Sequence, residues 1–173
     1  KLAVGKGIPQ ERLDLESWIV AANIAEESVG LAGGGTETRY LGGFVASEDD
    51  QPQAVLDAAL SGCAALLTDA GGKIGIKILT NDLASIAADF TADDVVGPFS
   101  WEPGLALDQL PNTIRGQYVS KTTTALYKEV DYPQVTLASL DGIERTRTMD
   151  FPVIESGFHA QRIAKMELQR LQY

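Results

Sequence analysis

The chain reads AALLTDAGGKIGIKI over residues 64–78, and this stretch decides the fold class. In its second part, Lys73 to Ile78, three isoleucines alternate with lysine and glycine, which is the period of a β-strand with one buried face. Gly71 and Gly72 separate that part from the apolar run before it, and a glycine pair between two such runs is typical of a tight turn. The sequence therefore predicts a β-hairpin.

Three amphipathic helices are predicted around this hairpin. The first is expected from about Asp14 to Glu26, with an apolar face made of Leu15, Trp18, Ile19, Ala22 and Ala25. The second starts at Pro52, because proline suits a first helical turn, and is expected to bury Val55, Leu56, Ala59, Leu60 and Cys63. The third is capped by Ser156, begins at about Gly157 and is expected to bury Ala160, Ile163, Ala164, Leu168 and Leu171.

The remaining elements predicted in the second half are short strands. They are expected over residues 112–119 and 145–153, and the polar stretch 120–140 is expected to be a long loop. Helices interspersed with antiparallel strands and hairpins indicate an α+β fold rather than a doubly wound sheet. Glycine–proline pairs near residue 98 predict two subdomains, 1–97 and 98–173.

Composition excludes several classes of protein. The chain has 173 residues, of which 45% are hydrophobic and 22% charged, as in ordinary globular domains. No apolar run approaches the roughly 20 residues of a membrane span. The net charge is −10, from 24 acids against 14 bases, so sequence-independent binding to nucleic-acid backbones is not expected. The chain begins at Lys1 without an initiator methionine or a signal peptide, and we expect it to be a fragment of a longer protein.

Nucleophilic and phosphate-binding chemistry finds little support in the sequence. The single cysteine, Cys63, lies on an apolar helix face, and the single histidine, His159, is expected at the surface or in a helix cap. One residue of each type excludes an internal disulfide and any site that needs two histidines. The run Gly33–Gly35 follows a helix and precedes a strand, the reverse of a phosphate-binding loop, so it predicts a turn.

Acidic clusters and exposed aromatics remain as candidates. Residues 48–50 and 93–94 carry neighbouring acids, but these lack the alternating spacing of a calcium loop and suit the positive ends of helix dipoles. Trp101 lies between glycine–proline pairs and serves either packing or an exposed contact. The sequence therefore predicts no catalytic residue, no bound metal and no cofactor.

Four stretches of the sequence are each too common to indicate a family alone, but their combined order and spacing are specific. They cover residues 18–26 with 35–40 and 43–45, residues 52–78, residues 90–94 with 112–118, and residues 150–153 with 159–165. Together they resemble the central region of phage tail hub proteins, the family of protein J-like tail tip attachment (host specificity) proteins, their prophage relatives and the hub of gene transfer agents. The chain departs from the family at Ile24-Ala25, where relatives often have a cysteine, and at Ile74, where tryptophan is common. Both departures are exchanges within a core.

The resemblance implies a structural protein of the virion tail tip rather than an enzyme. Such hubs assemble as homotrimers that close the distal end of the tail tube and bind other tail proteins. By this likeness the residues expected to serve assembly or structure are Arg39, Tyr40, Gly71, Gly72, Asn112, Arg115, Tyr118, Gln161, Arg162 and Lys165.

Several roles are expected within that set. Arg39 and Arg115 are expected to pair with acids at a subunit or subdomain contact, and Gly71 and Gly72 to turn the hairpin. The last three residues are expected to form the polar outer side of the final helix. Two alternatives stay open: a hub or spike component of a contractile injection machine, such as a tailocin or a type VI-like system, and a cell-wall hydrolase that uses two carboxylates.

Overall fold

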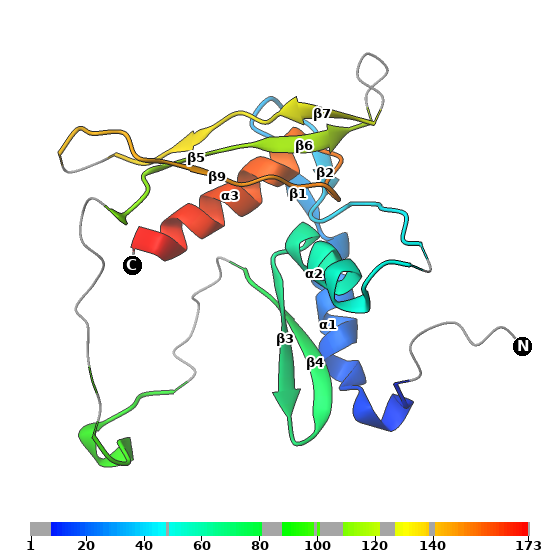
Figure 1. Ribbon diagram of the computed structural model, residues 1–173, viewed down its shortest axis with the longest axis vertical. Coiled ribbons are helices and arrows are strands. Elements are labelled where there is room, and N and C mark those ends of the chain that lie inside the picture. Colours follow the sequence, from blue (N-terminus) through cyan, green and yellow to red (C-terminus); the bar gives the residue numbers. More distant parts are fainter. Residues whose placement is uncertain are drawn as a thin grey trace, which may run out of the picture.

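The computed structural model describes residues 8–47, 49–80, 88–98, 100, 109–121, 127–138 and 141–172. Within them, three α-helices pack with short strands that pair mostly antiparallel, which confirms the α+β class (Figure 1). Trp101 lies outside the described residues. None of the described helices is long and apolar enough to cross a membrane. The subdomain boundary near residue 98 stays a prediction.

The N-terminal half contains α1 (Leu15–Glu26), α2 (Pro52–Gly62) and the hairpin of β3 (Ala65–Ala70) and β4 (Lys73–Ile78), preceded by a 3-10 turn, η1 (Gln10–Arg12). The register of the two strands runs from the pair Ala65–Ile78 to the pair Ala70–Lys73, which confirms the predicted hairpin. Gly71 and Gly72 have φ angles of +62° and +77°. Two successive residues in the left-handed region form the turn that joins twisted strands without splaying them, and glycine adopts it at little cost.

Helix α1 lies along the outer edge of β4. The Asp14 N–H and Trp18 Nε1 donate to the Ile74 carbonyl at 3.0 and 3.2 Å, and the Ile76 N–H donates to Ser17 Oγ at 3.1 Å. These bonds cover the edge that β4 would otherwise expose to another strand.

The predicted buried face of α1 is wrong in its main members. Leu15, Ile19 and Ala22 are exposed, whereas Trp18 and Ala25 are partly buried as expected. The buried residue is Ala21, which was not predicted. The helix carries apolar side chains on several sides, so its periodicity does not single out one face. Ser17 determines the orientation instead, because its hydroxyl accepts from the edge of β4.

Helix α2 follows its prediction more closely. The side chains of Val55, Leu56, Leu60 and Cys63 are partly buried, whereas Ala59 is exposed, contrary to the prediction. A second hairpin, of β1 (Ser28–Gly30) and β2 (Thr36–Thr38), follows α1 and encloses the triple glycine in its turn, as predicted.

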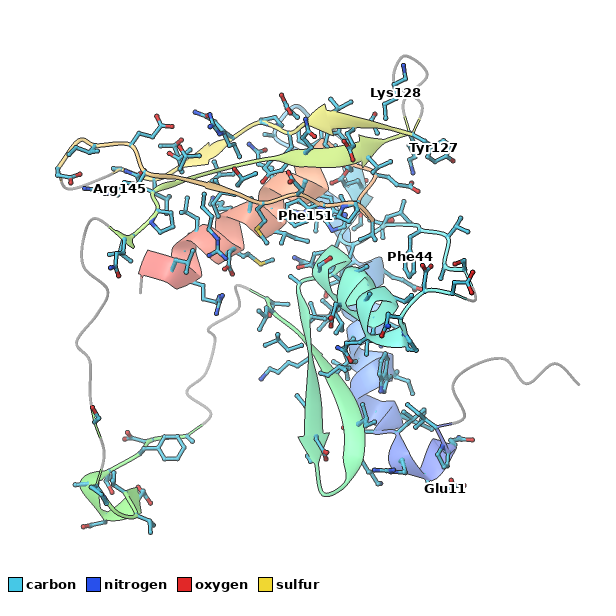
Figure 2. All side chains as sticks on the ribbon, viewed as in Figure 1. Glu11, Phe44, Tyr127, Lys128, Arg145 and Phe151 are labelled. Atoms are coloured by element: carbon cyan, nitrogen blue, oxygen red, sulfur yellow. The ribbon has the colours of Figure 1, made fainter. Side chains whose placement is uncertain are left out.

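The C-terminal half is built on helix α3 (Gly157–Gln172). One sheet has the order β8 (Val135–Thr136), β5 (Thr113–Arg115) and β9 (Thr146–Thr148), and a second pairs β6 (Gln117–Ser120) with β7 (Lys128–Asp131). Helix α3 contacts these strands, and the buried Phe151 lies beside the helix in Figure 2. The predicted stripe of α3 is buried at Ala160, Ile163, Ala164 and Leu168, and Leu171 is half-buried.

Three expectations for this half need correction. The strand expected over 112–119 breaks at Gly116, where a Cβ would collide with the Met149 carbonyl oxygen of the segment that runs parallel beside it. The stretch 120–140 is not a continuous loop, because β7 and β8 lie within it. The strand expected over 145–153 is limited to β9, and Phe151 adds only an isolated bridge to Tyr118. The acids at residues 93–94 lie in a 3-10 turn, η2 (Ala92–Asp94), which has a capping box between Thr91 and Asp94.

Candidate functional site

Two segments far apart in sequence meet where the N-terminal half contacts α3. We call this contact the seam, and it consists of residues 37–43 on one side and residues 153–162 on the other. The Gly43 N–H donates to the Val153 carbonyl at 3.0 Å, and Gly42 forms an antiparallel bridge with Ile154. A Cβ at Gly42 would collide with the same carbonyl oxygen, so the close approach of the two backbones requires glycine there.

Glu37 is the charged centre of the seam. Its Oε1 lies 2.5 Å from Arg162 Nη1, and its Oε2 accepts from Ser156 Oγ at 2.8 Å. Arg162 Nη2 also donates to the Arg39 carbonyl at 2.6 Å. The side chains of Arg162 and Glu37 are only 26% and 21% exposed. The pair is therefore partly removed from water, and hydrogen bonds to both carboxylate oxygens offset that cost.

His159 lies in the interior of the seam. It is 1% exposed, its Nδ1 lies 3.3 Å from the Leu41 carbonyl, and its ring centroid lies 5.2 Å from that of Tyr40. Because a carbonyl only accepts, the Leu41 carbonyl favours the neutral tautomer that carries its proton on Nδ1. Burial, and then the charge of Arg162, lower the pKa of His159 to about 4, although the carbonyls of Leu41 and Gly62 favour protonation.

The expected surface position of His159 is therefore wrong in this structure. Its side chain is a neutral core group near neutral pH. The helical period contains a signal for this position, because His159 precedes the buried Ile163 by four residues and so lies on the same face of α3. Ser156 acts as the predicted cap, since its Oγ accepts from the His159 N–H at 3.4 Å.

Arg39 and Tyr40 tie the end of α1 to the seam. Arg39 Nη2 and Nε lie 2.7 and 2.9 Å from Glu27 Oε2, and the Tyr40 N–H donates to the Ala25 carbonyl at 3.1 Å. Tyr40 is buried, and this burial raises the pKa of its hydroxyl. Arg39 thus pairs with an acid of its own half of the chain, while its carbonyl accepts from Arg162 across the seam.

The three residues predicted on the polar side of the last helix adjoin one cleft. Gln161, Arg162 and Lys165 line it together with the segment 134–137, and its volume is about 450 Å³. Arg162 does not face outward as expected, because its guanidinium points to Glu37. The remaining two stay at the polar border of the helix, with Lys165 exposed.

The other predicted residues lie apart from the seam centre. Asn112 is buried and fixes the loop before β9, since its Nδ2 donates to the Ile143 carbonyl and its Oδ1 accepts from the Arg145 N–H, both at 2.8 Å. Tyr118 has its ring beside Gly157, at the start of α3. Gly71 and Gly72 lie at the tip of the hairpin of β3 and β4.

Arg115 lines a second, polar cleft of about 490 Å³. Asp131 and Asp150 border the same cleft, and Gln117 holds both carboxylates: its Nε2 donates to Asp131 Oδ1 at 3.0 Å and its N–H donates to Asp150 Oδ1 at 2.9 Å. Tyr132 closes the inner wall, where burial and the nearby Asp150 raise its pKa to about 12. A hydrolase of the two-carboxylate kind would need such a pair of acids in one cleft, and a further cleft, lined by Glu11, Asp14 and Glu16, also brings carboxylates together.

The described residues contain no arranged site for a reactive thiol or for a bound metal ion. The Cys63 Sγ lies 3.4 and 3.6 Å from the Ala59 and Leu60 carbonyls, and burial raises the pKa of the thiol, which keeps it protonated at neutral pH. No group of three or more histidine, cysteine, aspartate or glutamate side chains in the described part of the chain is placed to hold a metal ion.

No protein-family model matches this chain, and no curated protein matches it. The likeness to tail hub proteins therefore rests on the residues quoted for it. Of those stretches, residues 35–40 and 43–45 contribute to one side of the seam, and residues 150–153 and 159–165 contribute to the other. The seam can hold two parts of the chain in one relative position, and its groups are engaged with one another rather than aimed into an open site.

Proposed function

We propose that this chain is a non-catalytic, structural domain of a phage or prophage tail tip hub protein. In this role it helps to assemble the distal end of the tail and supports host attachment and DNA delivery. The observation that carries the proposal is the seam, because two of the stretches that resemble hub proteins meet there although Glu37 and Arg162 are 125 positions apart.

The chemistry of the seam is suited to a part that keeps a fixed shape. Its ion pair, its buried histidine and its backbone bridge each satisfy a partner inside the chain. A group committed to such contacts is not available to a substrate. Assembly proteins use contacts of this kind to present their outer faces in a constant orientation.

Exposed apolar side chains supply surfaces for neighbouring subunits. Ile19 on α1 is 62% exposed and Leu66 on β3 is 57% exposed, and Phe90 is also largely exposed. A homotrimer joins two different faces of each copy, so the proposed ring needs two complementary surfaces. We place the domain in the virion, at the tail tip, beside tube and distal tail proteins, and its net charge of −10 suits basic neighbours.

The proposal is tested by locating the chain in particles. Gold-labelled antibodies raised against the purified chain are applied to virions or induced prophage particles and imaged by electron microscopy. We expect label at the distal tail end, and we expect the isolated full-length protein to form particles with three-fold symmetry. Label on heads or on no particle, together with a monomeric full-length protein, contradicts the proposal. Label at the tip of a contractile tail favours the injection-machine alternative.

A hydrolase is distinguished by turnover. The purified chain is incubated with peptidoglycan, and the release of soluble fragments is compared with that of an Asp150→Asn variant. We expect no release from either protein. Release by the native chain that is lost in the variant would identify the cleft of Asp131 and Asp150 as catalytic and would overturn the non-catalytic proposal.

A further inference from the structure

The outer edge of β3 carries backbone groups that point away from the hairpin. Helix α1 bonds to the backbone of Ile74 and Ile76, so these groups of β4 point away from β3. In an antiparallel pair, residues opposite such positions also point away from the partner strand. Leu67 and Asp69 are the register partners of Ile76 and Ile74. Their N–H and C=O groups therefore lie along the outer edge of β3.

This edge is uncovered in the part of the chain that the structure describes. There, β3 pairs with β4 alone, and Figure 1 shows α1 on the opposite side of β4. Leu66 is 57% exposed and Leu67 38% exposed, and the rest of the strand through Ala70 is exposed on both faces. Unpaired N–H and C=O groups in a row are a template for another extended strand.

Other edges of the described sheets are short or charged. Strand β7 carries Lys128, Glu129 and Asp131, and charges on an edge strand oppose pairing with another chain. Strands β8 and β9 have two and three residues. Strand β3 has six residues, with Asp69 as its single charge. Among the described strands with an uncovered edge, β3 is the longest and carries the fewest charges for its length. The best match to its edge is therefore β3 of a second copy.

We propose that β3 pairs antiparallel with β3 of a second copy of this chain, about a two-fold axis at Thr68. In this register Leu67 of one copy and Asp69 of the other form a hydrogen-bonded pair with two backbone hydrogen bonds. The two-fold axis repeats this pair, which gives four backbone hydrogen bonds in all. Thr68 lies opposite Thr68, and Leu66 lies opposite Ala70. No like charges face each other, and the two hairpins become one four-stranded antiparallel sheet.

The alternative two-fold register, centred on Leu67, fits less well. It would place Asp69 opposite Ala65 of the second copy, and Ala65 is 7% exposed and packed in the core. The register at Thr68 uses only residues 66–70, all of which are exposed. The contact is two-fold, so it is separate from the contacts of the proposed three-fold ring, which join two different faces of each copy. It involves the hairpin alone, goes beyond the proposed tail function and does not depend on it.

Such an interface is small. Five residues a side bury less than the roughly 1,000 Å² of a stable complex, so we expect weak dimerisation of the free chain. A covalent trap across the axis therefore detects the contact better than a measurement of mass. At a non-hydrogen-bonded antiparallel pair the two Cβ atoms lie about 4.5–5.5 Å apart, which is close enough for a disulfide after a small adjustment.

The test uses the full chain with Cys63→Ser, which removes the single native cysteine, and adds Thr68→Cys at the axis. Mild oxidation is followed by the covalent dimer on non-reducing gels. The matched control is Ala70→Cys, because in the proposed register the two Ala70 residues lie four positions apart, about 13 Å. We expect Thr68→Cys to dimerise at least tenfold faster than the control. A mixture of Leu66→Cys and Ala70→Cys, with different tags, is expected to give the heterodimer.

Equal rates for Thr68→Cys and Ala70→Cys, or no heterodimer from the mixture, overturn the proposal. Leu67→Pro provides a second measurement, because it removes an outward N–H and no β3–β4 hydrogen bond. Added to Thr68→Cys, it is expected to lower the dimerisation rate to that of the control, with the circular dichroism spectrum unchanged. The cysteine comparison decides the outcome even where the proline variant unfolds. Gold labelling of particles is a separate measurement, so failure of one proposal is distinguishable from failure of the other.

Discussion

Replacing His159 with glutamine is expected to remove a pH-dependent part of the stability of the chain. The imidazole is buried against Tyr40, with Nδ1 near the Leu41 carbonyl and no hydrogen-bond partner for Nε2 among the described residues. The interior therefore holds the neutral ring, and protonation would place a cation beside Arg162. Glutamine keeps a donor for the carbonyl but does not titrate.

The magnitude follows from the pKa of His159, which folding lowers from 6.5 to about 4. The unfolded chain binds the proton more readily, so the stability is complete above pH 6.5 and is lost as the pH falls towards 4. The whole loss is about 3 kcal/mol, and about 2 kcal/mol is lost by pH 5. Folding also lowers the pKa values of three carboxyl groups, those of Asp94, Asp141 and Glu167. These pKa values lie below 5 in both the unfolded and the folded chain, so a loss of stability between pH 7 and 5 is assigned to His159.

Urea unfolding at pH 7, 6 and 5, followed by far-ultraviolet circular dichroism, measures the effect. The native chain is expected to lose about 2 kcal/mol of unfolding free energy between pH 7 and 5. The His159→Gln variant is expected to be less stable at pH 7 and nearly constant over the same interval. Equal pH dependence in the two proteins would refute the buried, neutral histidine.

Two further substitutions test the seam, each by the midpoint of urea unfolding. Glu37→Gln leaves the half-buried guanidinium of Arg162 without its ion pair and is expected to cost about 2 kcal/mol, whereas Glu27→Gln, at a more exposed pair, is expected to cost less than about 1 kcal/mol. Equal losses of stability in the two variants would contradict a larger contribution from the pair of Glu37 and Arg162. Gly42→Ala forces a Cβ onto a backbone carbonyl and is expected to cost about 2 kcal/mol or more, whereas Gly30→Ala meets open space and is expected to change stability by less than about 1 kcal/mol. A tolerated Gly42→Ala would contradict the close approach.

Elements specified by local sequence could be predicted. The hairpin of β3 and β4 follows from alternation and a glycine pair, and the buried stripe of α3 follows from a clean helical period. For α1 the same reasoning failed, because apolar residues lie on several sides of the helix. The side that faces β4 carries the polar Ser17, whose hydroxyl accepts from the Ile76 N–H. The interruption at Gly116 was not predicted for a related reason: it depends on a distant segment, residues 146–151, that runs beside the strand, and nothing near Gly116 in the sequence records that neighbour.

The candidate site was only partly accessible to sequence reasoning. Arg39, Tyr40 and Arg162 were identified through the resemblance, and the structure brings them together at the seam. Glu37 lies inside a quoted stretch but has no local feature that marks it as their common partner. The pairing with Arg162 spans 125 positions, and periodicity carries no information over such a separation.

The polar centre of the seam is better explained by specificity than by stability. A partly buried ion pair pays a desolvation cost that well-packed apolar residues avoid, so Glu37 and Arg162 add little net stability over an apolar pair. Within the described residues, Arg162 Nε and His159 Nε2 are buried without partners, which adds a further cost. What an apolar contact lacks is a defined register, which here is given by the bonds of Glu37 to Arg162 and Ser156 and by the bridge of Gly42 to Ile154. These bonds fix residues 37–43 relative to residues 153–162, and a fixed relative position is what the proposed structural role would need.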